Sequence, residues 1–370
     1  MKRNLLIVIL IAFISCSQNN KGIETDFDHL LKDKFSEKEP GGIILVQKGL
    51  EVVYLNSYGV ADTKTNKKIT ANTIFNTGSI SKTFVSNGIL ILQEQGLLSV
   101  EDSIYKYFPD FKNKDIAKKI KIKHLLSHSS GLPDNRKTEE NKEFYMTAKD
   151  KGNFEPLKNV DSLVFEPGEK FEYSNPAYNG LALIIEQITQ KKWQDFIAEK
   201  IFKPSGMSDS RITDGDYPTK DVSHAYIKAD GRYKEFDYGE YPTFAAAGNG
   251  GVWCSVLDLA KYELAIRNNL FLSKQTIEKS RTILSPKNWK DTTPPKIGYS
   301  WFIQDKNDKK NKLGVKIVSH TGSQGGFRSF FISIPEKDII YAGLFNRPVK
   351  NLSEVRAKGL ELLKKHHWIE

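Results

Sequence analysis

Segments with the composition of β-strands lie near both ends of this chain, and the residues between them are mostly helical in pattern. Residues 41–49 and 51–59 are two strand-like runs joined by a turn at Lys48-Gly49. Three more strand-like runs follow one another near the C-terminus, at 314–320, 327–335 and 338–346. Helices are predicted at about 26–36, 79–95, 100–107, 122–127, 176–190, 255–267 and 353–367. We therefore predict the α/β (α+β) class: one antiparallel sheet built from both chain ends and flanked by helices, with a mostly helical subdomain inserted.

This pattern predicts a single elaborate domain over residues 25–368. The sheet subdomain is expected at about 25–78 and 255–368, and the helical subdomain at about 79–254. The net charge of +10 raises the question of nucleic-acid binding. The lysines are scattered among acidic residues, and no basic run alternates with stacking aromatics. A solvated, lysine-rich surface is the favoured interpretation, and no nucleic-acid partner is expected.

The first residues have the pattern of a secretory signal. Two cations precede an apolar run from Leu5 to Ile14, which is too short to cross a bilayer core of roughly 30 Å as a helix. We expect a signal peptide at 1–15, lipidation of Cys16, and a tether at 16–24. The alternative is an unmodified cysteine in an ordinary signal peptide. Lipidation would make the protein an exported, membrane-anchored lipoprotein of the cell envelope, in the periplasm or at the cell surface. Cys254 is the other cysteine, so the mature domain has no intramolecular disulfide framework.

A serine followed one helical turn later by a lysine opens the predicted helix at 79–95. Ser79 follows Gly78, where unpaired backbone amides and the helix dipole favour negative charge. Lys82 would lie on the same helix face, and a desolvated lysine can take the proton that a serine must lose to become a nucleophile. The alternative for Ser79 is a helix cap. A second match, Ser103 to Lys106, has the pattern of an ordinary first helical turn.

Two further motifs favour the interpretation of Ser79 as a nucleophile. Tyr173-Ser174-Asn175 follows a Pro-Gly turn, and His320-Thr321-Gly322 ends a predicted strand before a glycine-rich turn. Together with the segments at 122–133 and 201–207, they make residues 25–368 resemble the serine β-lactamase and penicillin-binding protein superfamily. The resemblance is greatest to its class C β-lactamase-like branch, which also holds esterases and D-amino-acid peptidases. It implies a β-lactamase-like fold.

The resemblance implies roles for three side chains. Ser79 would be the acylated nucleophile, and Lys82 would lie within hydrogen-bond reach of it. Tyr173 would be the base, as a phenolate or a proton relay, in acylation and in activating water for deacylation. A phenol with a pKa of about 10 is a poor base at neutral pH unless cations shift it. Lys82 and His320 could supply that field.

The resemblance also implies the remaining site residues. The amides of Ser79 and Ser323 would form the oxyanion hole, and Gly322 would let the backbone approach the substrate beside Thr321. Asn175 is read both as the N-cap before Pro176 and as a contact for substrate amides. His320 stands where true β-lactamases have a lysine. Because histidine is mostly neutral at pH 7, efficient penicillin hydrolysis is not expected. His320 would instead orient Tyr173 or share its proton.

Other candidate sites are weaker. His124 and His128 have the helical spacing of a metal pair but lack the glutamate of the zincin pattern. The resemblance gives them a structural part. The glycines at 248–251 lack the ending of a phosphate loop, and Arg328 is read as a surface arginine or as a carboxylate ligand. We expect no metal and no cofactor.

The combined hypothesis is an exported serine hydrolase that acts through a covalent acyl-enzyme on an ester or amide. An esterase or a D-amino-acid or peptidoglycan peptidase is favoured over an efficient β-lactamase. The substrate would be a small molecule or peptide, the lipid anchor would bind the membrane, and the oligomeric state stays open. The alternative is a penicillin-binding-like sensor that binds or is acylated without turnover.

Overall fold

A six-stranded antiparallel sheet forms the centre of the computed structural model, which describes residues 21–213, 217–236, 247–291 and 295–369. Its strand order is β2-β1-β12-β11-β10-β9, so the first and last strands of the chain lie side by side. In that junction Ile44 pairs with Gly343. The strands are β1 (Gly42–Lys48), β2 (Glu51–Tyr58), β9 (Phe302–Gln304), β10 (Ile317–Gln324), β11 (Phe327–Ile334) and β12 (Ile339–Phe345). The predicted sheet built from both chain ends is confirmed.

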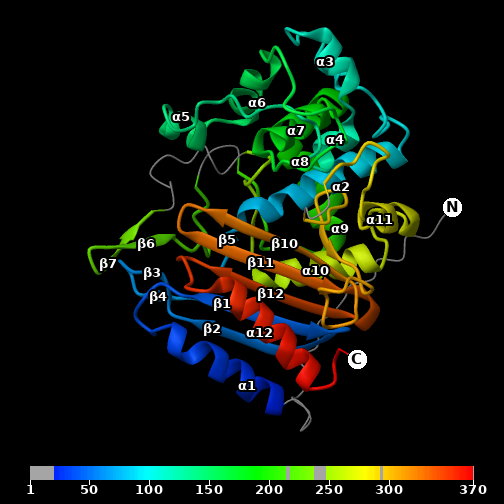
Figure 1. Ribbon diagram of the computed structural model, residues 1–370. Coiled ribbons are helices and arrows are strands. Elements are labelled where there is room, and N and C mark those ends of the chain that lie inside the picture. Colours follow the sequence, from blue (N-terminus) through cyan, green and yellow to red (C-terminus); the bar gives the residue numbers. More distant parts are fainter. Residues whose placement is uncertain (1–20, 214–216, 237–246, 292–294, 370) are drawn as a thin grey trace, which may run out of the picture.

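Helices cover both faces of this sheet (Figure 1). On one face, α1 (Lys21–Leu31) and α12 (Leu352–Lys365) pack over Ile44 and Val46 of β1. On the other face, α10 (Val256–Arg267) and the helical region pack over Ile43 and Leu45. Successive side chains of a strand point to opposite faces, so β1, which is covered on both sides, is apolar from Ile43 to Val46.

The helical region carries the longest inserted helices, α2 (Ser81–Glu94) and α7 (Asn175–Thr189), and the apolar faces of both are buried in one core. The other helices are α3 (Lys114–Lys119), α4 (Ile122–Leu126), α5 (Lys142–Thr147), α6 (Asp150–Lys158), α8 (Trp193–Ile197), α9 (Lys203–Ser205) and α11 (Lys274–Ser280), with a π-helical turn at Ala198–Phe202. The helix expected at 100–107 is only a 3₁₀ turn, Ile104–Lys106, capped by Ser103. No helix in these described ranges is both long and apolar enough to cross a membrane.

Two predicted boundaries differ in the structure. Helix α1 begins at Lys21, so residues 21–24, expected in the tether, are helical; its buried Ile23, Phe27 and Leu31 pull this turn onto the sheet. The signal peptide, Cys16 and the rest of the tether lie outside the described residues.

The hairpin of β6 (Tyr226–Ala229) and β7 (Arg232–Glu235) was expected in the helical subdomain but contacts the sheet side. The backbone N–H of Tyr226 donates to the Asn346 carbonyl at 2.8 Å, just after β12. Short strand pairs complete the fold: β3 (Val60–Asp62) with β4 (Lys67–Lys68), and β5 (Phe75–Asn76) with β8 (Trp253–Cys254).

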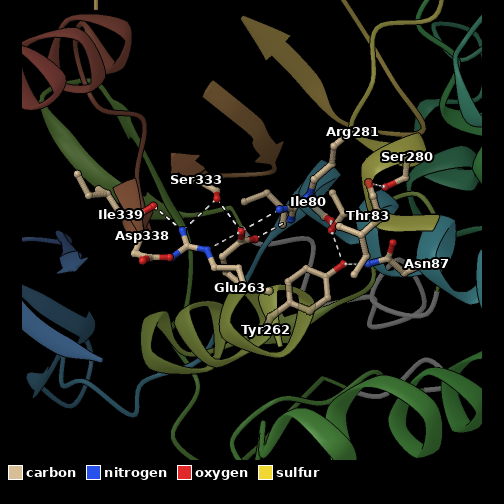
Figure 2. Close-up of polar contacts among 12 residues, drawn as sticks. Ile80, Thr83, Asn87, Tyr262, Glu263, Ser280, Arg281, Ser333, Asp338 and Ile339 are labelled. Carbon is tan, nitrogen blue, oxygen red and sulfur yellow. Dashed lines mark hydrogen bonds and ion pairs between the residues drawn. The ribbon is translucent and has the colours of Figure 1, made fainter. Parts of the chain in front are cut away.

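A buried polar cluster joins α10 to the sheet and to α2 (Figure 2). Glu263 on α10 accepts from Arg281 through both carboxylate oxygens, at 2.8 and 2.6 Å, and from Ser333 of β11 at 2.6 Å. The neighbouring Tyr262 donates its hydroxyl to Thr83 of α2 at 3.3 Å. Because buried charges need such partners, this cluster joins four segments that lie apart in the sequence.

Candidate active site

Ser79 lies in a 3₁₀ turn, Gly78–Ile80, that leads directly into α2. The turn presses against β10: a Cβ on Gly78 would lie 2.8 Å from the Ser323 nitrogen, and one on Gly322 would lie 2.0 Å from the Thr77 carbonyl oxygen. Gly78 also has a φ of +53°, which glycine adopts without strain. The two glycines therefore let the backbone of Ser79 and the backbone of Ser323 meet side by side.

Lys82 is completely buried on α2 beside the serine. Its Nζ is 3.1 Å from the Ser79 Oγ and donates to the Asn249 carbonyl at 2.7 Å. Burial lowers the pKa of Lys82 well below its ordinary value, and the charge of Arg136 lowers it further. A lowered pKa favours the neutral amine, whose lone pair can accept the serine proton.

Tyr173 precedes α7 and completes the group. Tyr173 and Ser79 line the same pocket, and the Lys82 Nζ lies 5.1 Å from the centre of the Tyr173 ring. Burial of the phenol raises the pKa of Tyr173 above its ordinary value, although the nearby Ser79 side chain lowers it. The resting side chain is therefore the neutral phenol. The structure thus brings together the hydroxyl, amine and phenol that the sequence indicated.

His320 and Thr321 lie within β10, because this strand extends to Gln324 and does not end at residue 320 as predicted. The His320 Nδ1 is 2.7 Å from the Thr321 carbonyl oxygen, and a carbonyl can only accept, so Nδ1 carries the proton. Burial and the charge of Lys82 lower the pKa of His320 to about 3. His320 is therefore neutral at physiological pH and supplies no cation in place of the lysine of true β-lactamases.

The N-cap of α7 is Ser174 and not Asn175. The Ser174 Oγ accepts from the Ala177 N–H at 3.3 Å, and Asn175 occupies the first helical position. Serine and asparagine both cap helices well, so two adjacent capping residues before Pro176 left the sequence ambiguous. Asn175 is half-buried at the N-terminus of this helix.

A pocket of about 380 Å³ opens beside Ser79. It is lined by Ser79, Tyr173, Phe302, His320, Thr321, Gly322, Ser323, Arg328, Ser329, Leu352, Ser353 and Arg356. Arg328 donates to the carbonyls of Gly325 and Phe327, at 2.8 and 2.7 Å, and so also shapes the β10–β11 turn. Arg356, on α12, is a wall residue that sequence reasoning missed. It reaches the pocket because the C-terminal helix packs back against the sheet.

Sequence reasoning also missed the position of His128. Its ring stacks on that of Tyr173, and its Nδ1 accepts from the Ser174 N–H at 3.0 Å. The motif at 122–133 indicated that this segment lies beside the site, but it did not indicate that His128 contacts Tyr173. In the described ranges, no group of three or more His, Cys, Asp or Glu side chains is placed to hold a metal ion.

Comparison with known proteins agrees with this geometry. The Beta-lactamase family matches residues 23–364. Penicillin-binding protein 4* of Bacillus subtilis is 29% identical over 316 residues, which are 81% of this chain and 67% of that protein.

Two solved structures have the same fold. The octameric penicillin-binding protein homologue from Pyrococcus abyssi aligns with a TM-score of 0.78 and 29% identity, over 93% of this chain and 77% of that one. The D-amino acid amidase from Ochrobactrum anthropi SV3, complexed with L-phenylalanine amide, aligns with a TM-score of 0.76 and 21% identity, over 95% of this chain and 100% of that one. With a family match across almost all of its described residues and a serine, lysine and tyrosine in contact, this chain belongs to the β-lactamase family of serine hydrolases.

Proposed function

We propose that this protein hydrolyses an ester or amide through an acyl-enzyme on Ser79, and that it acts as an esterase or D-amino-acid peptidase rather than an efficient β-lactamase. The observation that carries the proposal is the 3.1 Å contact of Ser79 with a buried Lys82 whose pKa is lowered by burial. About a third of the aligned curated relative lies outside the matched segment, because the match covers 67% of that protein, so the activity of that whole protein is not assigned to this chain.

The opposite shifts in the pKa values of Lys82 and Tyr173 favour Lys82 as the first proton acceptor. Lys82 has its pKa lowered and can accept a proton, whereas Tyr173 has its pKa raised and holds its own. As the Ser79 Oγ bonds to the substrate carbonyl carbon, its proton passes to the Lys82 Nζ. The carbonyl oxygen gains the negative charge, and the adjoining amides of Ser79 and Ser323 stabilise it. Such donors contribute roughly 3–4 kcal/mol each in comparable enzymes.

The tetrahedral intermediate then collapses. The bond to the leaving group breaks, the Tyr173 hydroxyl donates a proton to the departing oxygen or nitrogen, and the phenolate recovers a proton from Lys82. In deacylation the same groups work in reverse, so that a water gives its proton to this pair as its oxygen attacks the ester. This assignment makes Tyr173 a relay, which is one of the two roles the family resemblance implied.

The substrate type rests on His320. True β-lactamases offer a permanent cation at this position, and the neutral His320 does not. One of the solved structures with this fold is a D-amino acid amidase, which is consistent with a substrate lacking a carboxylate there.

We test the proposal with p-nitrophenyl acetate, D-alanine amide and nitrocefin, using the wild type and Ser79→Ala. Hydrolysis of the ester or the amide by the wild type alone is expected, with nitrocefin turned over slowly. Equal turnover by both proteins would overturn it. A lasting Ser79 adduct in mass spectrometry, without released product, would instead support a sensor.

We further propose export and lipidation of Cys16, which the cation-and-apolar pattern of residues 1–15 supports. Metabolic labelling with palmitate, compared between wild type and Cys16→Ser, tests it. Incorporation into the wild type alone is expected.

A further inference from the structure

We propose that Asp150 is a positioning residue for the catalytic lysine: its carboxylate fixes the turn at 247–251 whose Asn249 carbonyl holds Lys82. The inference rests on the proposed function, because it assigns how the base of that reaction is kept in place. Asp150 is the first residue of α6 and does not line the pocket.

A continuous chain of contacts links this carboxylate to the nucleophile. The Gly248 N–H donates to the Asp150 Oδ1 at 2.8 Å. The next residue, Asn249, accepts from the Lys82 Nζ at 2.7 Å through its carbonyl, and Lys82 reaches the Ser79 Oγ at 3.1 Å. Displacing the turn would therefore displace the amine.

Other contacts also give the turn at 247–251 a fixed shape, so that it moves as one unit with its Asp150 anchor. A Cβ on Gly248 would lie 2.7 Å from the Ala182 Cβ, so the backbone is pressed against α7. The N–H groups of Gly250 and Gly251 both donate to the Ala247 carbonyl, at 3.0 and 2.7 Å. The glycines that resembled a phosphate loop in the sequence thus serve a tight turn, whose outward carbonyl binds the lysine.

Asn179 on α7 forms a second link. Its Nδ2 donates to the Asp150 Oδ1 at 2.7 Å and lies 3.5 Å from the Asn249 Oδ1. The Asp150 Oδ2 has a different partner, the indole N–H of Trp193 on α8, at 2.9 Å. The two oxygens of one carboxylate therefore face two directions: Oδ1 faces the catalytic turn, and Oδ2 faces the core.

Burying this carboxylate is costly, because its partners among the described residues are the uncharged donors Gly248, Asn179 and Trp193. Asp150 is buried, and burial raises its pKa to about 7, although the Gly248, Asn179 and Trp193 hydrogen bonds lower it. A residue needed only for packing would be an apolar one at lower cost. The place of this buried carboxylate at the head of the chain of contacts supports a role in holding the lysine.

The asymmetry of the carboxylate gives the test. In the wild type, the Asp150 Oδ1 accepts from Gly248 and Asn179, and the Oδ2 accepts from Trp193. Asp150→Asn replaces these two acceptor oxygens by one oxygen and one NH₂ group. The Trp193 N–H therefore competes with the turn for the single oxygen. Trp193→Phe removes only the core-side donor, and Asp150→Asn/Trp193→Phe frees the amide oxygen to face Gly248.

We would measure kcat and KM on p-nitrophenyl acetate, with a thermal melt for each protein. Asp150→Asn is expected to lower kcat roughly ten- to hundredfold with little change in KM, since small displacements of catalytic groups cost this much. Trp193→Phe should keep the wild-type kcat despite a lower Tm, and the double variant should recover most of the loss.

Asn179→Ala gives a second variant that leaves the buried carboxylate intact, and it should lower kcat in the same sense. Wild-type kcat in folded Asp150→Asn and Asn179→Ala, or equal losses in Trp193→Phe, would overturn the inference. If the wild type itself showed no Ser79-dependent hydrolysis, the proposed function would fail first. The rate of Ser79 labelling by a fluorophosphonate would then still compare the variants, and equal rates would overturn the inference.

Discussion

The imidazole ring of His128 stacks on the phenol ring of Tyr173, with ring centres 4.2 Å apart and 27° between the planes. The same histidine accepts from the backbone N–H of Ser174, the residue that follows Tyr173, at 3.0 Å. Burial lowers the pKa of His128 well below its ordinary value, so the ring is neutral and its Nδ1 stays an acceptor. One side chain therefore fixes both the ring and the backbone of the tyrosine.

We expect His128→Leu to lower kcat on p-nitrophenyl acetate roughly ten- to hundredfold, because Tyr173 loses its support against Ser79. His124→Leu is the matched control. His124 belongs to the same motif and accepts from the Lys121 N–H at 3.1 Å, as part of the α4 cap. Both variants should lose stability, but only the first should lose kcat per folded molecule. Comparable kcat in the two variants would show that the stacking has no catalytic consequence.

The pH dependence of activity should follow Lys82. If its neutral amine is the base, kcat/KM falls as the pH drops through the Lys82 pKa. Arg136 is buried, and its charge is one cause of the lowered pKa. Arg136→Met removes that charge, so the Lys82 pKa rises and the acid limb of the profile moves to higher pH.

A pH profile of kcat/KM on p-nitrophenyl acetate measures this shift. Lys106→Met is the control, because Lys106 is an exposed partner of Asp102 and is not among the causes that shift the Lys82 pKa. Its profile should coincide with that of the wild type. An unmoved acid limb in Arg136→Met would assign the limb to another group.

The parts of the fold that sequence could predict are those set by local pattern. The strands at 42–48 and 339–345 are mainly apolar and are bounded by turn residues, and Ser79 and Lys82 are one helical turn apart. Their contact with Tyr173 was inferred from family resemblance, and no periodicity in the chain indicates it.

The missed features depend on contacts between distant segments. The Asn249 carbonyl is a backbone group, so the identity of its side chain says nothing of its use. Arg356 reaches the pocket because α12 packs back against the sheet, and His128 meets Tyr173 only through tertiary packing. The cap of α7 was misassigned by one residue, because Ser174 and Asn175 are both good caps.

Stability should depend strongly on Glu263, whose carboxylate is shown with Arg281 and Ser333 in Figure 2. Glu263→Gln leaves a buried arginine charge without its partner, which costs about 3–5 kcal/mol in the free energy of unfolding. Glu199→Gln is the control, since Glu199 pairs with Lys191 and Lys200 at the surface and should change stability little. Urea unfolding at pH 7 measures both.

We also expect the loss of stability in Glu263→Gln to depend on pH. Burial alone would raise the pKa of Glu263, but Arg281, Arg267 and Ser333 lower it below its ordinary value. The carboxylate therefore stabilises the fold at pH values above its unfolded-state pKa, and this contribution is lost as the pH falls through its folded-state pKa. The stability gap between wild type and Glu263→Gln should narrow on acidification. A gap that stays constant down to acid pH would contradict the ion-pair explanation.

Arg356 should set how the pocket treats anionic substrates. It lines the pocket beside the neutral His320, and its Nε is buried with no hydrogen-bond partner among the described residues. A substrate carboxylate could pair with this guanidinium, and such charge-assisted contacts are worth about 1.5–3 kcal/mol. Arg356→Ala is therefore expected to raise KM roughly tenfold or more for nitrocefin, which carries a carboxylate, and to leave KM for neutral p-nitrophenyl acetate unchanged. Lys358 lies on the same helix but pairs with Glu354 at the surface, so Lys358→Ala should change neither KM. An equal rise in KM for both substrates would mean that Arg356 shapes the pocket wall and does not recognise charge.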